Sequence, residues 1–158
     1  EGQAVMVDMA GNYGVYCTDM TRTYSIGRLS DEAYRLHELS LEIHRQVMQK
    51  AAPGSSCADL YNESLRMVEE AGASPYFMGT ELQAQFVGHG LGLQINELPV
   101  LMGRSKDRLQ PGMVIAFEPK FVLPHIGAVG IENTYLVTET GIENLTPAPE
   151  EIIDLTQR

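Results

Sequence analysis

The sequence predicts an α+β fold. Segments with the residue alternation of strands come first, two amphipathic helical segments follow, and strand-like segments separated by turn signals make up the remainder. The chain has 158 residues, of which 44% are hydrophobic and 20% are charged, and both fractions are ordinary for a globular protein. This length, without an internal repeat or a low-complexity linker, predicts one domain over residues 1–158.

The first segment, residues 5–26, is predicted to form an antiparallel hairpin. Tyrosine and threonine, which favour strands, are frequent in residues 13–16 and 22–26. The pair Gly11-Asn12 is a turn signal, so we expect the turn at that pair and a long second arm after it.

Two helices are predicted next. The first begins after Ser30, a residue type that caps helix N-termini, and ends before Pro53. The second begins after Ser55 or Ser56 and ends at Gly72. Each has an apolar stripe at helical spacing, formed by Leu36, Leu39, Ile43 and Val47 in the first and by Leu60, Tyr61, Leu65 and Val68 in the second.

The rest of the chain predicts strands over residues 84–87, 113–117, 128–138 and 143–145. Two histidines on the first helix, His37 and His44, lie seven residues apart and therefore share a face. We expect that face to be solvated or interfacial rather than a functional site.

The charge balance excludes two classes of protein. The chain has 11 Lys and Arg against 21 Asp and Glu, a net charge of -10. A nucleic-acid binder needs a basic surface to contact phosphates, and an anionic membrane repels an acidic surface. We therefore expect no nucleic-acid and no membrane partner. The two cysteines, Cys17 and Cys57, lack a metal-binding spacing and predict reduced thiols and a cytoplasmic location.

Four acidic residues and one histidine suggest a metal centre: Asp8, Asp19, His89, Glu118 and Glu132. Glu132 lies in an apolar segment, where a carboxylate is costly to bury unless it is paired or binds a metal. Glycines on both sides of His89 indicate a close approach of the backbone. Carboxylates that converge need a cation to neutralise them, and this donor set suits two divalent ions of Mn, Co, Zn or Fe. From spacing alone the convergence is a hypothesis, because a single acid is ordinarily a solvated surface charge.

In this order, the five residues make the chain resemble the catalytic domain of the pita-bread metallopeptidases, the family of prolidase, aminopeptidase P, methionine aminopeptidase and creatinase. Asp19 follows Asp8 by eleven positions in a D-x-T-R-T run, His89 lies in G-H-G-x-G, Glu118 in E-P and Glu132 in I-E. The resemblance covers residues 4–145 and is nearest to the Xaa-Pro peptidases. It implies a curved antiparallel sheet with helices on its outer face.

The resemblance also implies a role for each residue. Asp8 would hold one ion, Asp19 and Glu132 would bridge both ions, and His89 and Glu118 would complete the second. Glu118 would in addition be the catalytic residue, the general base that takes a proton from the attacking water.

The chain departs from the family pattern at three points. Asn96 stands where Xaa-Pro-specific members have a second histidine, and Gly130 stands where they often have an arginine. Only seven residues precede Asp8, so we expect the N-terminal part of the catalytic domain to be missing. Asn96 and His125 are the candidate substrate-binding residues, although an ordinary loop position is the preferred interpretation of His125.

The function expected from this resemblance is a two-metal hydrolase that cleaves the N-terminal residue from small peptides, as an Xaa-Pro dipeptidase or aminopeptidase. Two alternatives stay open: a metal-binding module without activity, and a creatinase-like hydrolase of a non-peptide C–N bond. The expected partners are a small peptide and either a second copy of the chain or the missing N-terminal part. Thr21 and Thr134 could orient the carboxylates, but ordinary strand threonines are the preferred interpretation.

Overall fold

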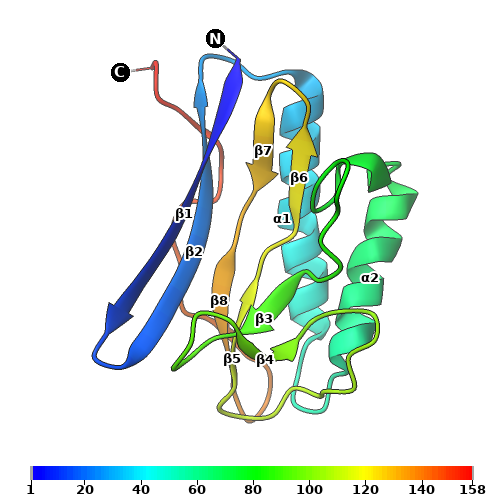
Figure 1. Ribbon diagram of the computed structural model, residues 1–158, viewed down its shortest axis with the longest axis vertical. Helices are drawn as coiled ribbons and strands as arrows, with labels where there is room; N and C mark the ends of the chain where they lie inside the picture. The colour runs from blue at the N-terminus through cyan, green and yellow to red at the C-terminus, as the bar shows by residue number, and fades with distance from the viewer. Residues whose placement is uncertain (1, 158) are drawn as a thin grey trace.

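The structure, a computed structural model, describes residues 2–157 and confirms the α+β fold (Figure 1). The helices are α1 (Asp31–Lys50), α2 (Cys57–Glu70) and the 3₁₀ helix η1 (Ser74–Tyr76). The strands are β1 (Gln3–Tyr13), β2 (Tyr16–Ile26), β3 (Gly88–Gly90), β4 (Glu97–Val100), β5 (Val114–Phe117), β6 (Lys120–Leu123), β7 (Gly127–Gly130), β8 (Asn133–Val137), β9 (Ile142–Asn144) and β10 (Ile153–Asp154).

The strands form three groups. The long β1–β2 hairpin pairs with β10, an antiparallel sheet has the order β4-β3-β5-β8-β9, and β6 and β7 form a two-stranded ribbon. The predicted hairpin over residues 5–26 is confirmed, but its predicted turn is wrong. Gly11 and Asn12 lie inside β1, and the chain turns at Gly14, whose φ of 63° suits a residue without a side chain.

Two of the predicted strands differ from the structure. Residues 84–87 are a loop, in which the Ala84 N–H donates to the carbonyl of Met78 rather than to a strand. The strand expected over residues 128–138 is divided into β7 and β8 by Ile131 and Glu132. The break follows Gly130, which has a φ of 133° and lies so close to Pro119 that a Cβ atom would be 2.7 Å from its carbonyl oxygen. A residue with a side chain, such as the arginine of the family pattern, would be strained in this position.

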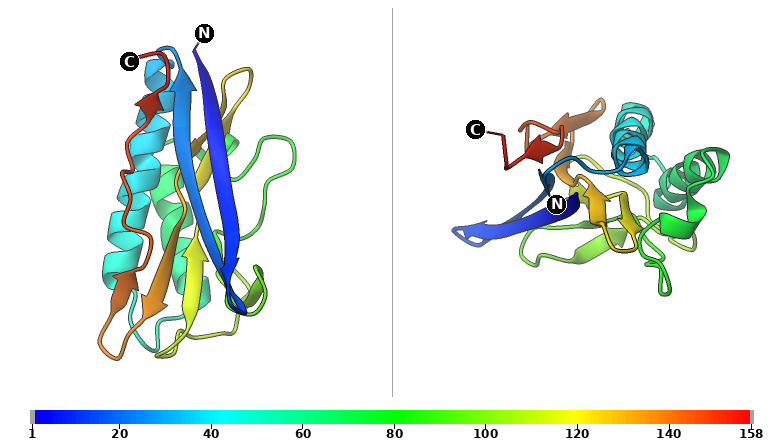
Figure 2. Two further views of the ribbon diagram at one scale, coloured as in Figure 1. Left: turned by 90° about the vertical axis from the view of Figure 1, so that its left-hand side faces the viewer. Right: turned by 90° about the horizontal axis from the view of Figure 1, so that it is seen from above.

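The predicted helix starts are confirmed, because the Ser30 and Ser56 hydroxyls accept hydrogen bonds from Ala33 N and Asp59 N. Figure 2 shows the two helices side by side, with the β1–β2 hairpin extending away from them. α1 packs against β6, β7 and α2. The core therefore lies between the helices and the strands, and its largest fully buried side chains include Leu36, Ile43, Phe117 and Phe121. No helix in residues 2–157 has the length and apolarity needed to span a bilayer.

The expectation of a solvated or interfacial face at His37 and His44 is wrong, because both side chains are buried against the strands. His37 Nε2 lies 2.7 Å from the carbonyl oxygen of Glu150, and His44 lies within hydrogen-bond distance of Tyr135 and Ile131. Burial lowers the pKa of His44 to about 3, so its ring is neutral. His44 therefore ties α1 to β8, His37 ties it to the C-terminal segment at Glu150, and both are part of the buried interior.

Candidate metal centre

The β1–β2 hairpin places two of the predicted ligands on one face. In its register Asp8 is opposite Thr21, and Ala10 is opposite Asp19. Because side chains alternate along a strand, all four positions share the same face. The Asp19 side chain is buried, whereas the Asp8 side chain is 58% exposed.

His89 is the central residue of β3, between β4 and β5. A Cβ atom at Gly88 would lie 2.4 Å from the Ala116 carbonyl oxygen, and one at Gly90 would lie 2.3 Å from that of Leu98. The predicted close backbone approach beside His89 is therefore confirmed. The ring atom Nδ1 is 3.1 Å from the Gly90 carbonyl oxygen. When Nδ1–H donates to that oxygen, Nε2 presents its lone pair to the carboxylates.

The two late glutamates lie next to the ends of strands. Glu118 directly follows β5, and Glu132 lies in the break between β7 and β8, where its backbone pairs with that of Thr21. The Thr21 hydroxyl also donates to Glu132 Oε2 at 2.7 Å. The interpretation of Thr21 as an ordinary strand threonine is therefore wrong, because it orients a predicted ligand. The Thr134 hydroxyl instead donates to the backbone carbonyl of Asp19 at 2.7 Å, which anchors β2 to β8.

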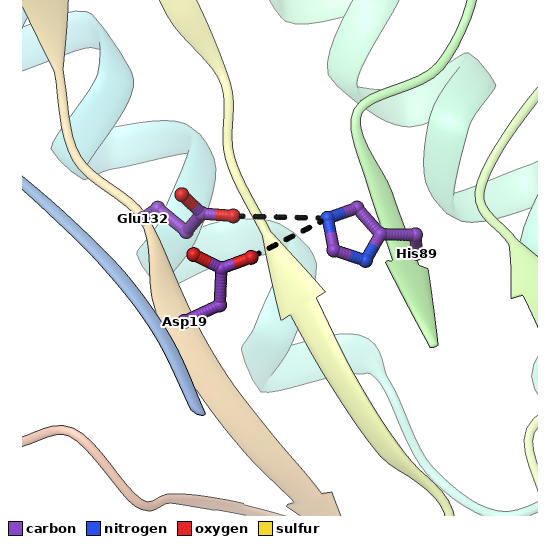
Figure 3. A group of neighbouring side chains, drawn as sticks. All are labelled: Asp19, His89 and Glu132. Carbon is purple, nitrogen blue, oxygen red and sulfur yellow. Dashed lines mark ion pairs between the residues drawn. The ribbon is translucent and has the colours of Figure 1, made fainter. Parts of the chain in front are cut away.

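These side chains meet around His89 Nε2. Glu118 Oε1 is 3.6 Å from this nitrogen. Asp19 Oδ2 and Glu132 Oε1 are each 3.9 Å from it, and Figure 3 shows both carboxylates directed toward the ring. One donor atom each from Asp19, His89 and Glu132 lies within 4.8 Å of the others. Carboxylate oxygens and an imidazole nitrogen are the donors that Mn, Co, Fe and Zn accept, so this buried group fits a divalent metal ion.

One residue of the cluster, Lys120, is not among the residues predicted from the sequence. Its Nζ lies 2.7 Å from Glu118 Oε2, 3.7 Å from Glu132 Oε2 and 3.8 Å from Asp8 Oδ2. Burial would lower the pKa of this ammonium, but Glu118 and Glu132 outweigh the burial and raise the pKa above its ordinary value. The signal was present in the sequence, since Lys120 follows Glu118 by two positions, a spacing that puts side chains on one side of an extended chain.

Of the two candidate substrate-binding residues, Asn96 lies at the site and His125 lies at the surface. A cavity of about 490 Å³ is lined by Asp8, Ala10, Asp19, Phe86, His89, Ile95, Asn96, Glu118 and Glu132. Asn96 also lines an adjoining, mostly apolar cavity of about 420 Å³ together with Phe86, Leu98 and Val100. His125 lines neither of these cavities. It is exposed in the turn of the β6–β7 ribbon, at the end opposite Lys120, so the structure does not bring it to the cluster.

The metal-free cluster should make stability depend on pH. Burial, reinforced by the Asp8 carboxylate, raises the pKa of Asp19 to about 6. Burial also raises the pKa of Glu132 to about 7, with Lys120 opposing and Glu118 adding to the shift. Through these two carboxyl groups the folded protein holds protons that the unfolded chain has released, so their contribution to the free energy of unfolding should fall as the pH rises from about 4 to about 7. The neutral, buried His44 contributes with the opposite sign over much of this range, because its pKa is lowered on folding.

Metal binding should reverse this trend, because a bound ion requires the ionised carboxylates. We expect the rise in melting temperature caused by MnCl₂ to be larger at about pH 7.5 than at about pH 5.5. Thermal denaturation with and without the metal measures it, and Asp31→Asn, at the exposed start of α1, should keep the full response. An equal rise at both pH values would contradict the assignment of these two carboxyl groups.

A methyl group added at Gly90, next to His89 in β3, should disturb the metal centre. Gly90→Ala forces the β4 backbone away, and we expect a loss of about 1–3 kcal/mol in the free energy of unfolding, together with weaker metal binding. Urea denaturation measures the first effect and metal titration the second. Gly141→Ala is the matched control, because nothing lies within 4 Å of the added methyl group. If the two variants have the same free energy of unfolding and the same metal affinity, the close packing beside His89 stabilises neither the fold nor the metal centre.

Comparison with known proteins agrees with the fold and the site. The sequence model of metallopeptidase family M24 matches residues 1–139. An Xaa-Pro dipeptidase of Pyrococcus furiosus is 32% identical over 152 residues, which are 96% of this chain and 42% of that protein. An uncharacterized peptidase of Staphylococcus epidermidis is 34% identical over 146 residues, 92% of this chain and 40% of that protein.

Solved structures give the same result. The crystal structure of an X-Pro aminopeptidase from Thermotoga maritima matches with a TM-score of 0.88 at 29% identity, over 98% of this chain and 42% of that one. A prolidase from Pyrococcus furiosus matches with a TM-score of 0.86 at 32% identity, over 94% of this chain and 42% of the other. These matches confirm the predicted pita-bread fold, and the chain spans about two fifths of the length of these relatives.

Proposed function

Since the chain belongs to metallopeptidase family M24, we propose that its protein is a metal-dependent hydrolase that removes the N-terminal residue of small peptides, with Xaa-Pro bonds as the preferred substrate. The observation that carries the proposal is the convergence of Asp8, Asp19, His89, Glu118 and Glu132 on one cavity. Relatives that are named as Xaa-Pro peptidases support the choice of substrate.

A bound metal would polarise the scissile carbonyl and stabilise the negative charge that develops on its oxygen. Asp19, His89 and Glu132 would hold the metal, and Thr21 would keep the Glu132 carboxylate in position. Glu118 lines the same cavity, beside these ligands, and would accept the proton of the attacking water. Its second oxygen, Oε2, is paired with Lys120, which fixes the orientation of the carboxylate.

The neighbouring apolar cavity supports a small substrate. It adjoins the metal centre through Phe86, His89 and Asn96, and its other lining residues include Leu98 and Val100. An apolar ring or a short aliphatic side chain would fit such a surface. The Asn96 amide would donate a hydrogen bond to a substrate carbonyl, a neutral interaction where a histidine would be able to supply charge.

Metal analysis and a hydrolysis assay on the full-length protein test the proposal. After reconstitution with Mn²⁺ or Co²⁺, we expect bound metal by elemental analysis and cleavage of Xaa-Pro dipeptides faster than of matched Xaa-Ala dipeptides. EDTA should remove the activity, and added metal should restore it. A protein that binds no divalent metal after reconstitution would contradict the proposal.

Two other outcomes correspond to the alternatives. Bound metal without turnover of any peptide in a dipeptide library would favour a binding module, for which Asn96 in place of a histidine is the supporting feature. Hydrolysis of creatine with no cleavage of peptides would favour a non-peptide C–N substrate.

A further inference from the structure

Glu118 and Glu132 divide the acidic cluster into two halves. Glu118 and Glu132 each direct Oε1 toward His89 Nε2, at 3.6 and 3.9 Å, and each direct Oε2 toward Lys120 Nζ, at 2.7 and 3.7 Å. Asp19 Oδ2 lies on the His89 side, at 3.9 Å from Nε2. Asp8 Oδ2 lies on the Lys120 side, at 3.8 Å from Nζ. Two neighbouring positions for a cation result, which share two bridging carboxylates.

The half that faces His89 has the dimensions of a metal site. Ligands of a tetrahedral ion with bonds of about 2.1 Å are about 3.4 Å apart. The three oxygens stand only slightly farther than this from His89 Nε2. One donor atom each from Asp19, His89 and Glu132 already lies within 4.8 Å of the others, so a small inward movement of these three side chains would close the site around one ion.

The half that faces Lys120 already contains a cation. The ammonium group has three N–H donors, and three carboxylate oxygens surround it. Its side chain is only 17% exposed, so it has little free access to solvent. The backbone of Lys120 is held in the β6–β7 ribbon opposite Gly130, and its carbonyl accepts a hydrogen bond from Met78 N at 2.9 Å.

We propose that the centre takes one divalent ion, in the half that faces His89, and that the Lys120 ammonium occupies the other half in place of a second ion. The inference rests on the proposed function, because it assumes that the cluster binds metal at all. A second ion would have to expel a largely buried ammonium from its three carboxylates, and until it did so the two cations would repel each other across Glu118 and Glu132. The number of ions expected from the family resemblance, two, is thereby reduced to one.

The number of bound ions tests this proposal directly. The full-length protein is dialysed against excess MnCl₂ and then against buffer, and manganese per chain is measured by elemental analysis. We expect one ion per chain in the wild type and two in Lys120→Met, which keeps the aliphatic stem but removes the charge. Lys120→Arg should keep one ion, and so should Lys106→Met, a substitution of an exposed lysine.

Electron paramagnetic resonance gives a second measurement on the unmutated protein. A single Mn²⁺ ion gives the spectrum of an isolated ion, whereas two ions that share bridging carboxylates give a spin-coupled spectrum. This result does not depend on whether Lys120→Met folds. Circular dichroism shows whether that variant retains its structure.

Each outcome has a separate meaning. Two ions in the wild type, or a coupled spectrum, would overturn the role of Lys120 while leaving the proposed function standing. One ion in both the wild type and a folded Lys120→Met protein would also overturn it. Absence of metal from both proteins would instead remove the metal centre, and the proposed function with it.

Discussion

Replacing Glu118 with glutamine is expected to abolish hydrolysis while leaving the fold intact. Glutamine keeps the shape of the side chain, which is 8% exposed, and its carbonyl oxygen can still accept a hydrogen bond from Lys120. The amide cannot take a proton from water, so general-base catalysis is lost. We expect kcat to fall by about 10²–10⁴-fold, the usual contribution of a positioned acid or base.

The rate must be measured together with the metal content, because Glu118 also faces the predicted metal position. Steady-state hydrolysis of a dipeptide, with elemental analysis of the same sample, separates the two effects. Glu143→Gln, on the exposed side of β9, is the matched control and should retain the wild-type rate. Unchanged turnover of Glu118→Gln at full metal occupancy would show that Glu118 is not the base.

The second large effect is expected at Arg22, whose guanidinium group connects three parts of the chain. It donates to the backbone carbonyls of Thr21 and Glu132 at 2.8 and 2.9 Å, and to the Asn133 side chain at 2.8 Å. It also donates to three carbonyls near the C-terminus, those of Thr146, Ala148 and Pro149. The residue is only 5% exposed, and its hydrogen bonds to Thr21, Glu132 and Asn133 are buried.

Arg22→Ala should therefore lower the free energy of unfolding by about 3–5 kcal/mol, because it breaks a hydrogen-bond network that connects β2, β8 and the C-terminal segment. It should also weaken metal binding, since Arg22 holds the backbone of Glu132. Chemical denaturation and metal titration measure the two effects. Arg104→Ala, at an exposed position, should change the stability by less than about 0.5 kcal/mol. A similar small change for Arg22→Ala would show that the network does not stabilise the fold.

The sequence predicted those features that depend on neighbouring residues. Helix starts at Ser30 and Ser56 follow from side chains that bond to the next turn, and the structure contains both bonds. The glycines beside His89 also indicated a close backbone contact correctly. The hairpin turn was misplaced because Gly11-Asn12 and Gly14 are both local turn signals, and the pairing of the whole strand decides between them.

The predictions that failed concern features set by distant parts of the chain. His37 and His44 are polar residues on a helix, and only the strands packed on α1 make their face a buried one. The division of residues 128–138 into two strands depends on the contact between Gly130 and Pro119, which comes from the pairing of β6 with β7. His125 lies between the two late glutamates in the sequence, but the β6–β7 ribbon carries it to the end opposite Lys120, in agreement with its preferred interpretation as a loop residue.

The sequence by itself determined the fold class, the family resemblance and the five candidate ligands in their order, because each of these depends on residue types and short spacings. The tertiary structure alone decided that Glu118 and Glu132 each face both His89 and Lys120, and that the Lys120 ammonium lies among three carboxylates. The reason is geometric. Which oxygen of a carboxylate meets which cation depends on strand register and on the packing of segments more than a hundred residues apart, and no local pattern in the sequence specifies that.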